Sequence, residues 1–366
     1  MKRTILLNPG PVNVSERVRN AMLRGDLCHR EAEFSDLMAG IRRKLVEIFG
    51  LEKEYTSVLI SGSGTAALEM GVSSCLSPGK TMLVIQNGVY GERIAEMADA
   101  YGLKKQVLTY PWGSPPKPGD VESALSENPD IEVVAMVHHE TTTGLMNPLQ
   151  QVGEIVHKFN RRFLVDGISS LAGEEIDFEN SHVDFFIGTA NKCIQGLPGV
   201  SFILINKREL QRLEKMPKRS VYFDLQGYYK SQEAGGVLFT PAVQAHYAFD
   251  EALDELREET PAGRISRYRA AAKLLREGFS EMGLEFLIPE HYHSNSLTAL
   301  KLPDGTAYAL IHDHLKKNGF VIYAGQGGLS KEIFRVANMG DIKTEEFVEF
   351  IGSLKECLSV TGKIQG

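Results

Sequence analysis

Three short segments place chemically active side chains directly after apolar runs that could form buried strands. They are "SGSGT" at residues 61–65, "VDG" around Asp166, and "TANKC" around Lys192. A lysine that is shielded from water loses part of its preference for the charged form, and its neutral amine is then a nucleophile. The carboxyl ends of parallel strands face a ligand crevice, so these segments are candidates for one shared site.

The glycine-rich turn leads from an apolar run into a helix-like segment. Free backbone N–H groups at a helix N-terminus attract phosphate, and the hydroxyls of Ser63 and Thr65 could add donors. The turn also fits the dinucleotide pattern G-x-G-x-x-A at residues 62–67. That pattern requires an acidic residue at the end of the next strand, where this chain has Gln86. A nicotinamide-dependent oxidoreductase is therefore a weaker alternative, and a turn without a ligand is another.

Asp166 and Lys192 each have an ordinary alternative role. Asp166 could cap a helix, and most lysines are simply solvated. Taken together with the turn, however, the two residues match the needs of pyridoxal 5′-phosphate. The lysine would hold the aldehyde, the turn the phosphate, and the carboxylate a proton on the pyridine nitrogen. A protein that binds this cofactor without catalysis is a further alternative.

The composition is that of an ordinary globular protein. The 366 residues are 43% hydrophobic and 24% charged. Forty Lys+Arg against 47 Asp+Glu leave a net charge of −7 without a long run of either sign, so nothing favours nucleic-acid binding. The four cysteines lie far apart and form no C-x-x-C pair, so we expect no metal site and no disulfide framework.

The start of the chain has a short apolar run before "NPGP", and this run is too short for a signal peptide. No later apolar run approaches the length that spans a membrane. We therefore expect a cytoplasmic protein without membrane association.

Apolar runs alternate with helix-like segments in the first half of the chain. Most of the runs are apolar at successive positions, which is typical of a sheet covered by helices on both faces. The predicted strands are 55–61, 81–86, 104–110, 132–139, 162–167, 183–188 and 200–206, and the predicted helices between them are 64–76, 90–102 and 148–160. This pattern predicts an α/β fold with a mostly parallel seven-stranded sheet.

The pattern changes after residue 206. Helices are predicted at 240–259, 263–283, 307–319 and 343–358, with short strands at 296–303, 319–325 and 333–340. We expect a smaller C-terminal α+β domain. The expected division is a large domain of residues 15–255 and a small domain of residues 1–14 and 256–366.

Several motifs resemble the class V aminotransferases, which are fold-type I pyridoxal phosphate enzymes. The resemblance runs from residue 5 to about residue 355 and rests on "LLNPGP", "CHRE", "SGSGT", "NGVYGERIAEMA", "HHETTTGLMNP", "DGISSLAG", "ANKCIQGLPG", "FTPAVQ" and "FRVANMGD". It implies that Lys192 forms the internal aldimine with pyridoxal phosphate. It also implies that Asp166 holds the pyridine nitrogen and that Ser63, Gly64 and Thr65 hold the phosphate.

The resemblance assigns further residues around the cofactor. Tyr90 would stack on the ring, as an aromatic face suits a flat π-system, although a half-buried core tyrosine is the alternative. Thr141 would lie near the hydroxyl side of the ring. Thr240 would reach the phosphate from the neighbouring subunit, which implies a homodimer with shared active sites.

Two arginines are candidates for substrate binding. Arg335 corresponds to the family's carboxylate-binding arginine, and its planar fork suits bidentate recognition of a carboxylate. Arg30 is a candidate for a phosphonate or a second anion. Its alternative is an ion pair with Glu31 or Glu33.

Within the family, the motifs are most similar to transaminases that move the amino group of 2-aminoethylphosphonate to pyruvate, giving phosphonoacetaldehyde and L-alanine, or that run the reverse reaction. An alanine–glyoxylate or serine–pyruvate transaminase is the alternative. Glu174, Glu175 and the segment "FTPAVQ" depart from the family pattern and leave the amino donor and the direction open.

Overall fold

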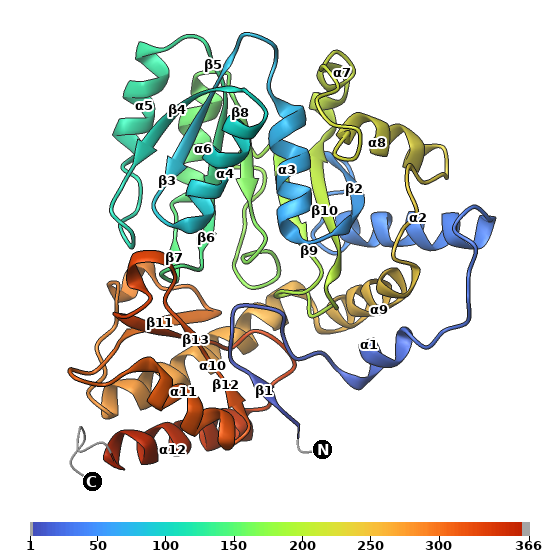
Figure 1. Ribbon diagram of the computed structural model, residues 1–366. Helices are drawn as coiled ribbons and strands as arrows, with labels where there is room; N and C mark the ends of the chain where they lie inside the picture. The colour runs from blue at the N-terminus through green and yellow to red at the C-terminus, as the bar shows by residue number, and fades with distance from the viewer. Residues whose placement is uncertain (1–2, 361–366) are drawn as a thin grey trace.

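A seven-stranded sheet forms the centre of the larger part of the molecule (Figure 1). The computed structural model describes residues 3–360. In sheet order the strands are β2 (Tyr55–Gly62), β10 (Gly199–Asn206), β9 (Phe185–Thr189), β8 (Arg162–Asp166), β5 (Ile131–Val137), β3 (Thr81–Gln86) and β4 (Lys104–Thr109). The strand β10 runs antiparallel to both of its neighbours, and the others run parallel to one another. The expected fold class is confirmed.

Helices cover both faces of this sheet, which explains why its strands lack polar alternation. Along β5, Val133 and Ala135 belong to one buried cluster, and Val134 and Met136 belong to the cluster on the opposite face. The first face carries α3 (Gly64–Cys75), α4 (Val89–Ala100), α7 (Leu210–Leu213) and α8 (Leu225–Glu233). The second carries α1 (Glu16–Ala21), α2 (Ala32–Glu47), α5 (Pro118–Glu127), α6 (Leu149–Lys158) and α9 (Val243–Glu259).

The C-terminal part contains its own sheet and apolar core, drawn from orange to red in Figure 1. Its sheet has the order β11 (Leu297–Lys301), β14 (Ile333–Ala337), β13 (Tyr323–Ala324). The helices α10 (Pro261–Glu281), α11 (Tyr308–Lys317) and α12 (Thr344–Val360) accompany it. Short elements elsewhere are the strands β6 (His139–Glu140) and β7 (Leu145–Met146) and the 3-10 turns η1 (Lys207–Glu209), η2 (Glu290–Tyr292) and η3 (Gly327–Leu329).

The single strand expected at residues 319–325 is divided in two. Its first half, β12 (Phe320–Val321), pairs in parallel with β1 (Ile5–Leu6), and its second half, β13, pairs with β14. The buried Ile322 separates the halves. Because buried backbone groups need hydrogen-bond partners, each half pairs with the strand beside it, and the sequence pattern does not show this change of partner.

The start of the chain belongs structurally to the C-terminal part. Ile5 and Leu7 are buried in its apolar core, and Leu7 N–H donates to the carbonyl of Val321 at 2.8 Å. Figure 1 shows the blue N-terminal segment passing between this part and the sheet. Residues from the two ends of the chain therefore form one unit.

No helix among residues 3–360 has both the length and the apolar character needed to cross a membrane. All four cysteines are free thiols.

Gly153 offers a test of how closely α6 approaches the loop beside it. A Cβ at this position would lie 2.0 Å from the carbonyl oxygen of Ser181. We expect Gly153→Ala to lower the free energy of unfolding by about 1–3 kcal/mol, measured by urea denaturation, because backbone atoms must move apart. Gly40, in α2, has open space where its Cβ would lie, so Gly40→Ala should stabilise by about 0.5–1 kcal/mol. Equal stability of the two variants would contradict the close approach.

Candidate active site

The carboxyl ends of several strands meet at one edge of the large sheet, and a cavity of about 180 Å³ lies there. The turn after β2 supplies the start of α3, β8 ends at Asp166, and Lys192 follows β9 by three residues. The structure brings six of the predicted site residues into the lining, which are Ser63, Gly64, Thr65, Tyr90, Asp166 and Lys192. Segments far apart in sequence therefore converge as the strand order requires.

Lys192 is half-buried beneath the N-terminal segment. Its Nζ donates a hydrogen bond to the carbonyl of Pro9. Gly10 has φ +107°, and a Cβ there would lie 2.7 Å from Cδ of Lys192, so this position requires a glycine. Burial lowers the pKa of Lys192 to about 8, although the nearby Asp166 carboxylate favours the charged form. At pH 7 about a tenth of such amines are neutral, far more than for a solvated lysine.

Asp166 is buried at the end of β8. One carboxylate oxygen accepts a hydrogen bond from the backbone N–H of Ile168 at 3.0 Å. Burial raises the pKa of Asp166 to about 6, and the Ile168 N–H and the charges of Lys192 and Arg93 oppose that rise. The group is therefore mostly a carboxylate at pH 7. No helix begins in residues 167–173, so Asp166 does not cap a helix and that alternative is wrong. The hydrogen bond from the Ile168 N–H to Asp166 closes a turn instead.

The first turn of α3 is open to a ligand. Ser63 occupies the N-cap position, but no side chain caps the backbone N–H groups of this turn. Gly64 is buried against Ile168, where a Cβ would lie 2.8 Å from the Ile168 Cδ1. Thr65 is half-buried beside it. The turn therefore keeps free donors that could hold a phosphate.

Tyr90 has the half-buried position that the sequence left open, and its place in the cavity lining is compatible with the predicted stacking role. It is half-buried against the apolar cluster under α3 and α4, and it also lines the cavity. Its backbone N–H and that of Gly91 donate to the buried carboxylate of Glu140, at 3.2 and 3.3 Å. Thr142 donates to the same carboxylate through its backbone and its hydroxyl. Glu140, which the sequence analysis did not single out, thus fixes the start of α4.

Arg335 is buried near the cavity without belonging to its lining. Its Nη1 donates to the carbonyl of Thr141 at 2.9 Å and to Gln326 at 3.1 Å, and its Nε donates to the carbonyl of Ala324 at 3.0 Å. Its charge is close enough to lower the pKa of Lys192. Thr141 is buried but does not line the cavity. Its backbone carbonyl is the acceptor that holds Arg335.

Two further predicted site residues, besides Arg335 and Thr141, lie outside this cavity lining in the single chain. Thr240 is exposed and borders a separate small recess. Arg30 is exposed in the turn before α2, and within residues 3–360 it makes no ion pair with Glu31 or Glu33. The ion-pair alternative for Arg30 is therefore not observed.

Among the cavity-lining residues that the sequence analysis missed, two have ionisable side chains, His139 and Arg93. The Nδ1 of His139 lies 3.3 Å from the carbonyl of Ser169 and must donate to it, while the buried Nε2 has no partner in the described chain. Burial lowers the pKa of His139 to about 4, so the ring is neutral. Polar residues directly after the apolar run at 131–137 were the signal that could have identified His139.

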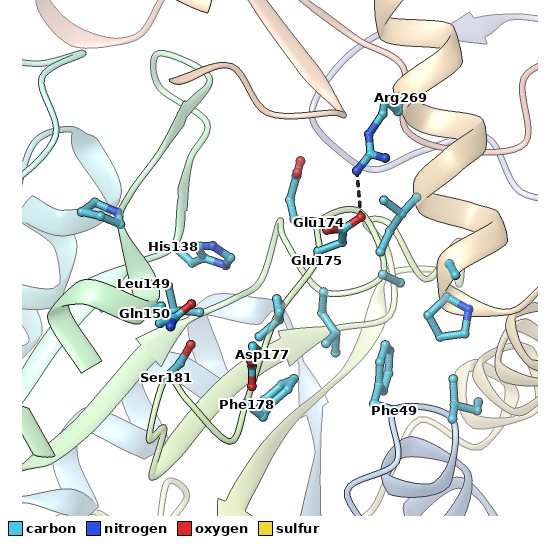
Figure 2. A pocket seen from close by; sticks show the side chains of 18 of the residues that line it. Phe49, His138, Leu149, Gln150, Glu174, Glu175, Asp177, Phe178, Ser181 and Arg269 are labelled. Carbon is cyan, nitrogen blue, oxygen red and sulfur yellow. Dashed lines mark hydrogen bonds and ion pairs between the residues drawn. The ribbon is translucent and has the colours of Figure 1, made fainter. Parts of the chain in front are cut away.

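A larger cavity of about 1070 Å³ lies elsewhere, between α6, the start of α10 and the loop at residues 171–178 (Figure 2). Glu174 and Glu175 border it, and Glu175 pairs with Arg269 at 2.9 Å. Burial raises the pKa of Glu174 to about 8. Neither glutamate lines the Lys192 cavity. Although larger, this cavity lacks the lysine and the buried aspartate, so the smaller one is the candidate active site.

The smaller cavity fits pyridoxal phosphate. The uncapped first turn of α3 would hold the phosphate, Lys192 would hold the aldehyde, and the buried carboxylate of Asp166 would face the ring nitrogen. Tyr90 supplies an aromatic face, and the unpartnered Nε2 of His139 is a free acceptor for a polar group of a ligand. The donors and acceptors left open thus match the groups that the cofactor carries.

The lowered pKa of Lys192 predicts how cofactor capture depends on pH. Because the neutral amine reacts with an aldehyde, the rate at which the apoprotein takes up pyridoxal phosphate should rise about tenfold from pH 7 to pH 9 and then level off. Stopped-flow absorbance would measure this rate. A rate that continues to rise tenfold per pH unit up to pH 10 would contradict the lowered pKa.

Comparison with known proteins agrees with this geometry. The family described as Aminotransferase class-V matches residues 13–339. A 2-aminoethylphosphonate–pyruvate transaminase of Vibrio cholerae is 35% identical over 97% of this chain and 97% of its own length. A relative of the same name from Lysinibacillus sphaericus is 36% identical over 93% of both chains.

Solved structures give the same result for the fold. The ureidoglycine–glyoxylate aminotransferase of Bacillus subtilis has a TM-score of 0.95 at 26% identity, covering 100% of this chain and 96% of its own. An alanine–glyoxylate aminotransferase from Nostoc has a TM-score of 0.91 at 28% identity, covering 98% and 96%. These matches exclude the alternative that the glycine-rich turn belongs to a nicotinamide-dependent oxidoreductase. The chain belongs to the class V aminotransferases and is a fold-type I enzyme that depends on pyridoxal phosphate.

Proposed function

We propose that this enzyme transfers the amino group of 2-aminoethylphosphonate to pyruvate, giving phosphonoacetaldehyde and L-alanine or running in reverse. The observation that carries the proposal is the cavity that joins Lys192, Asp166 and the uncapped turn of α3, with Arg335 beside it. The relatives that bear this activity in their names are 35–36% identical over nearly the full chain. The alanine–glyoxylate enzyme with the same fold is less similar, at 28% identity.

Asp166, Lys192 and Tyr90 each have a separate role in the proposed reaction. Pyridoxal phosphate, when bound, supplies an electron sink that stabilises negative charge at the carbon bearing the amino group. Asp166 would keep a proton on the ring nitrogen, which would keep that sink effective. The amine of Lys192 would hold the cofactor and, once displaced by the amine of the donor, would act in its neutral form as the base that takes the proton from the amine-bearing carbon. Tyr90 would offer its aromatic face to the ring.

The substrates carry anionic groups, and Arg335 is the proposed partner of the pyruvate carboxylate. Its Nη2 has no hydrogen-bond partner among residues 3–360, whereas its other nitrogens are held by Thr141, Ala324 and Gln326. Those bonds fix the plane of the guanidinium group, so it is oriented before a carboxylate arrives. Arg30 stays a candidate for a second anion contact, supported by its exposed and unpaired side chain.

The proposal includes a homodimer in the cytoplasm. Thr240 is exposed and lies outside the cavity of its own chain, as expected for a residue that reaches the phosphate of a neighbouring subunit. The domain division is also kept as a proposal, with residues 15–255 around the cofactor and residues 1–14 and 256–366 as the cover. The pairing of β1 with β12 and the contact of Pro9 with Lys192 support it.

The dimer can be tested by sedimentation equilibrium. We expect a mass of about twice 40.5 kDa at micromolar concentration. Thr240→Ala should keep that mass and bind pyridoxal phosphate several-fold more weakly, because one donor to the phosphate is lost. A monomer with full activity would contradict the shared active sites.

A donor-panel assay tests the function. Alanine formation from pyruvate is measured with 2-aminoethylphosphonate, serine or aspartate as the amino donor. We expect the phosphonate to be the best donor, and Lys192→Ala to lower kcat by at least about a thousandfold because both the covalent hold and the base are removed. Rapid turnover of serine without turnover of the phosphonate would overturn the assigned substrate, and an active Lys192→Ala enzyme would overturn the mechanism.

A further inference from the structure

Arg93 is a cation in the active-site cavity that the mechanism above does not use. It lies on the second turn of α4, is half-buried, and lines the cavity together with Lys192 and Asp166. Its guanidinium carbon lies 5.0 Å from the centre of the Tyr90 ring. The ring that would stack on the cofactor therefore also supports this arginine.

Three acidic side chains near Arg93 are committed to other partners, and Glu96, three residues further along α4, forms no ion pair with it among residues 3–360. Glu92 accepts from the indole of Trp112 at 2.9 Å, Glu140 accepts from the start of α4 and from Thr142, and Asp166 accepts from a backbone N–H. Within residues 3–360, the guanidinium group of Arg93 has no hydrogen bond and no ion pair. The guanidinium group lies against the Tyr90 ring, and its charge acts on Lys192 and Asp166.

An arginine in this setting favours an anionic ligand. Half-buried guanidinium groups are usually paired, because partial loss of water must be offset by an acceptor. Here the open side of the group faces a cavity in place of a protein carboxylate. The positive charges of Arg93 and Arg335, which both act on Lys192, make this cavity attractive to negative charge.

The number of free donors on Arg335 indicates which anion Arg93 would bind. Two nitrogens of Arg335 are bonded to neutral oxygens, so one nitrogen is free, which suits one carboxylate oxygen. A phosphoryl-type dianion has three oxygens and nearly two charges, and it needs more donors than that. Arg93, which lines the cavity, supplies further donors.

We propose that Arg93 binds a phosphoryl-type dianion in the active site, either the phosphonate of the amino donor or the phosphate of the cofactor. If the anion is the phosphonate, the inference rests on the proposed function. If the anion is the phosphate of the cofactor, the inference does not depend on the identity of the amino donor. The carboxylate of pyruvate stays with Arg335.

The experiment compares Arg93→Gln and Arg93→Lys with the parent enzyme. Three constants are measured for each protein. They are the KM values for 2-aminoethylphosphonate and for pyruvate in the holoenzyme, and the Kd of pyridoxal phosphate from absorbance titration of the apoprotein. We expect Arg93→Gln to raise either the phosphonate KM or the cofactor Kd by about tenfold to a hundredfold, with the pyruvate KM within about twofold. Arg93→Lys should recover part of the loss because it keeps the charge.

Arg43→Gln is the matched control. Arg43 is an exposed residue of α2 in an i,i+4 pair with Glu47, so its replacement removes one charge far from the cavity. It should leave all three constants unchanged. Thermal unfolding of each variant checks that the fold is kept.

Each outcome decides between the sources or rejects the proposal. A raised phosphonate KM alone assigns the donor, and a raised cofactor Kd assigns the phosphate. Unchanged values for both, or an increase confined to pyruvate, would overturn the proposal. If the parent enzyme does not accept the phosphonate, the proposed function fails, and the cofactor Kd alone then decides the role of Arg93.

Discussion

Desolvation of opposite charges at the carboxyl edge of the sheet is the constraint on which the rest of the structure depends. The adjacent parallel strands β8 and β9 pair Asp166 with Ile187, which places Lys192 five residues beyond that rung. Burial alone would drive both groups towards their neutral forms, and each favours the charged form of the other. The result is a lysine that is partly neutral and an aspartate that is mostly ionised near pH 7, which a transaminase requires.

The cover over this edge comes from parts of the chain that are remote in sequence. The N-terminal segment brings Pro9 and Gly10 onto Lys192, and the same segment is hydrogen-bonded to the C-terminal part through β1 and β12. On the other side, Arg335 is anchored to the backbone of Thr141. The site is thus closed by interactions between the smaller unit and the large sheet, and they exclude the water that would restore an ordinary lysine pKa.

Cavity size is a poor guide to the chemistry of this protein. Among residues 3–360 the larger cavity is lined by a buried glutamate, an ion pair and two unpartnered polar atoms, His138 Nδ1 and Ser181 Oγ, but by no lysine. The smaller one contains residues with perturbed pKa values, an uncapped helix start and an unpartnered imidazole nitrogen. A lysine with a lowered pKa beside a buried carboxylate and free N–H donors identifies the ligand site better than volume does, because these groups together can carry out chemistry on a bound ligand.

The sequence by itself determined the fold class, the family and the residues at strand ends. Apolar runs without alternation indicated a covered parallel sheet, and glycine, aspartate and lysine after those runs indicated the cofactor. The tertiary structure decided which side chains share a cavity. It brought in Arg93 and His139, and it split the strand expected at 319–325. It left four predicted site residues outside the cavity lining, namely Thr141, Arg335, Thr240 and Arg30. Local pattern reports burial and periodicity, whereas hydrogen-bond partners and the closing of one segment over another depend on contacts between residues far apart in the chain.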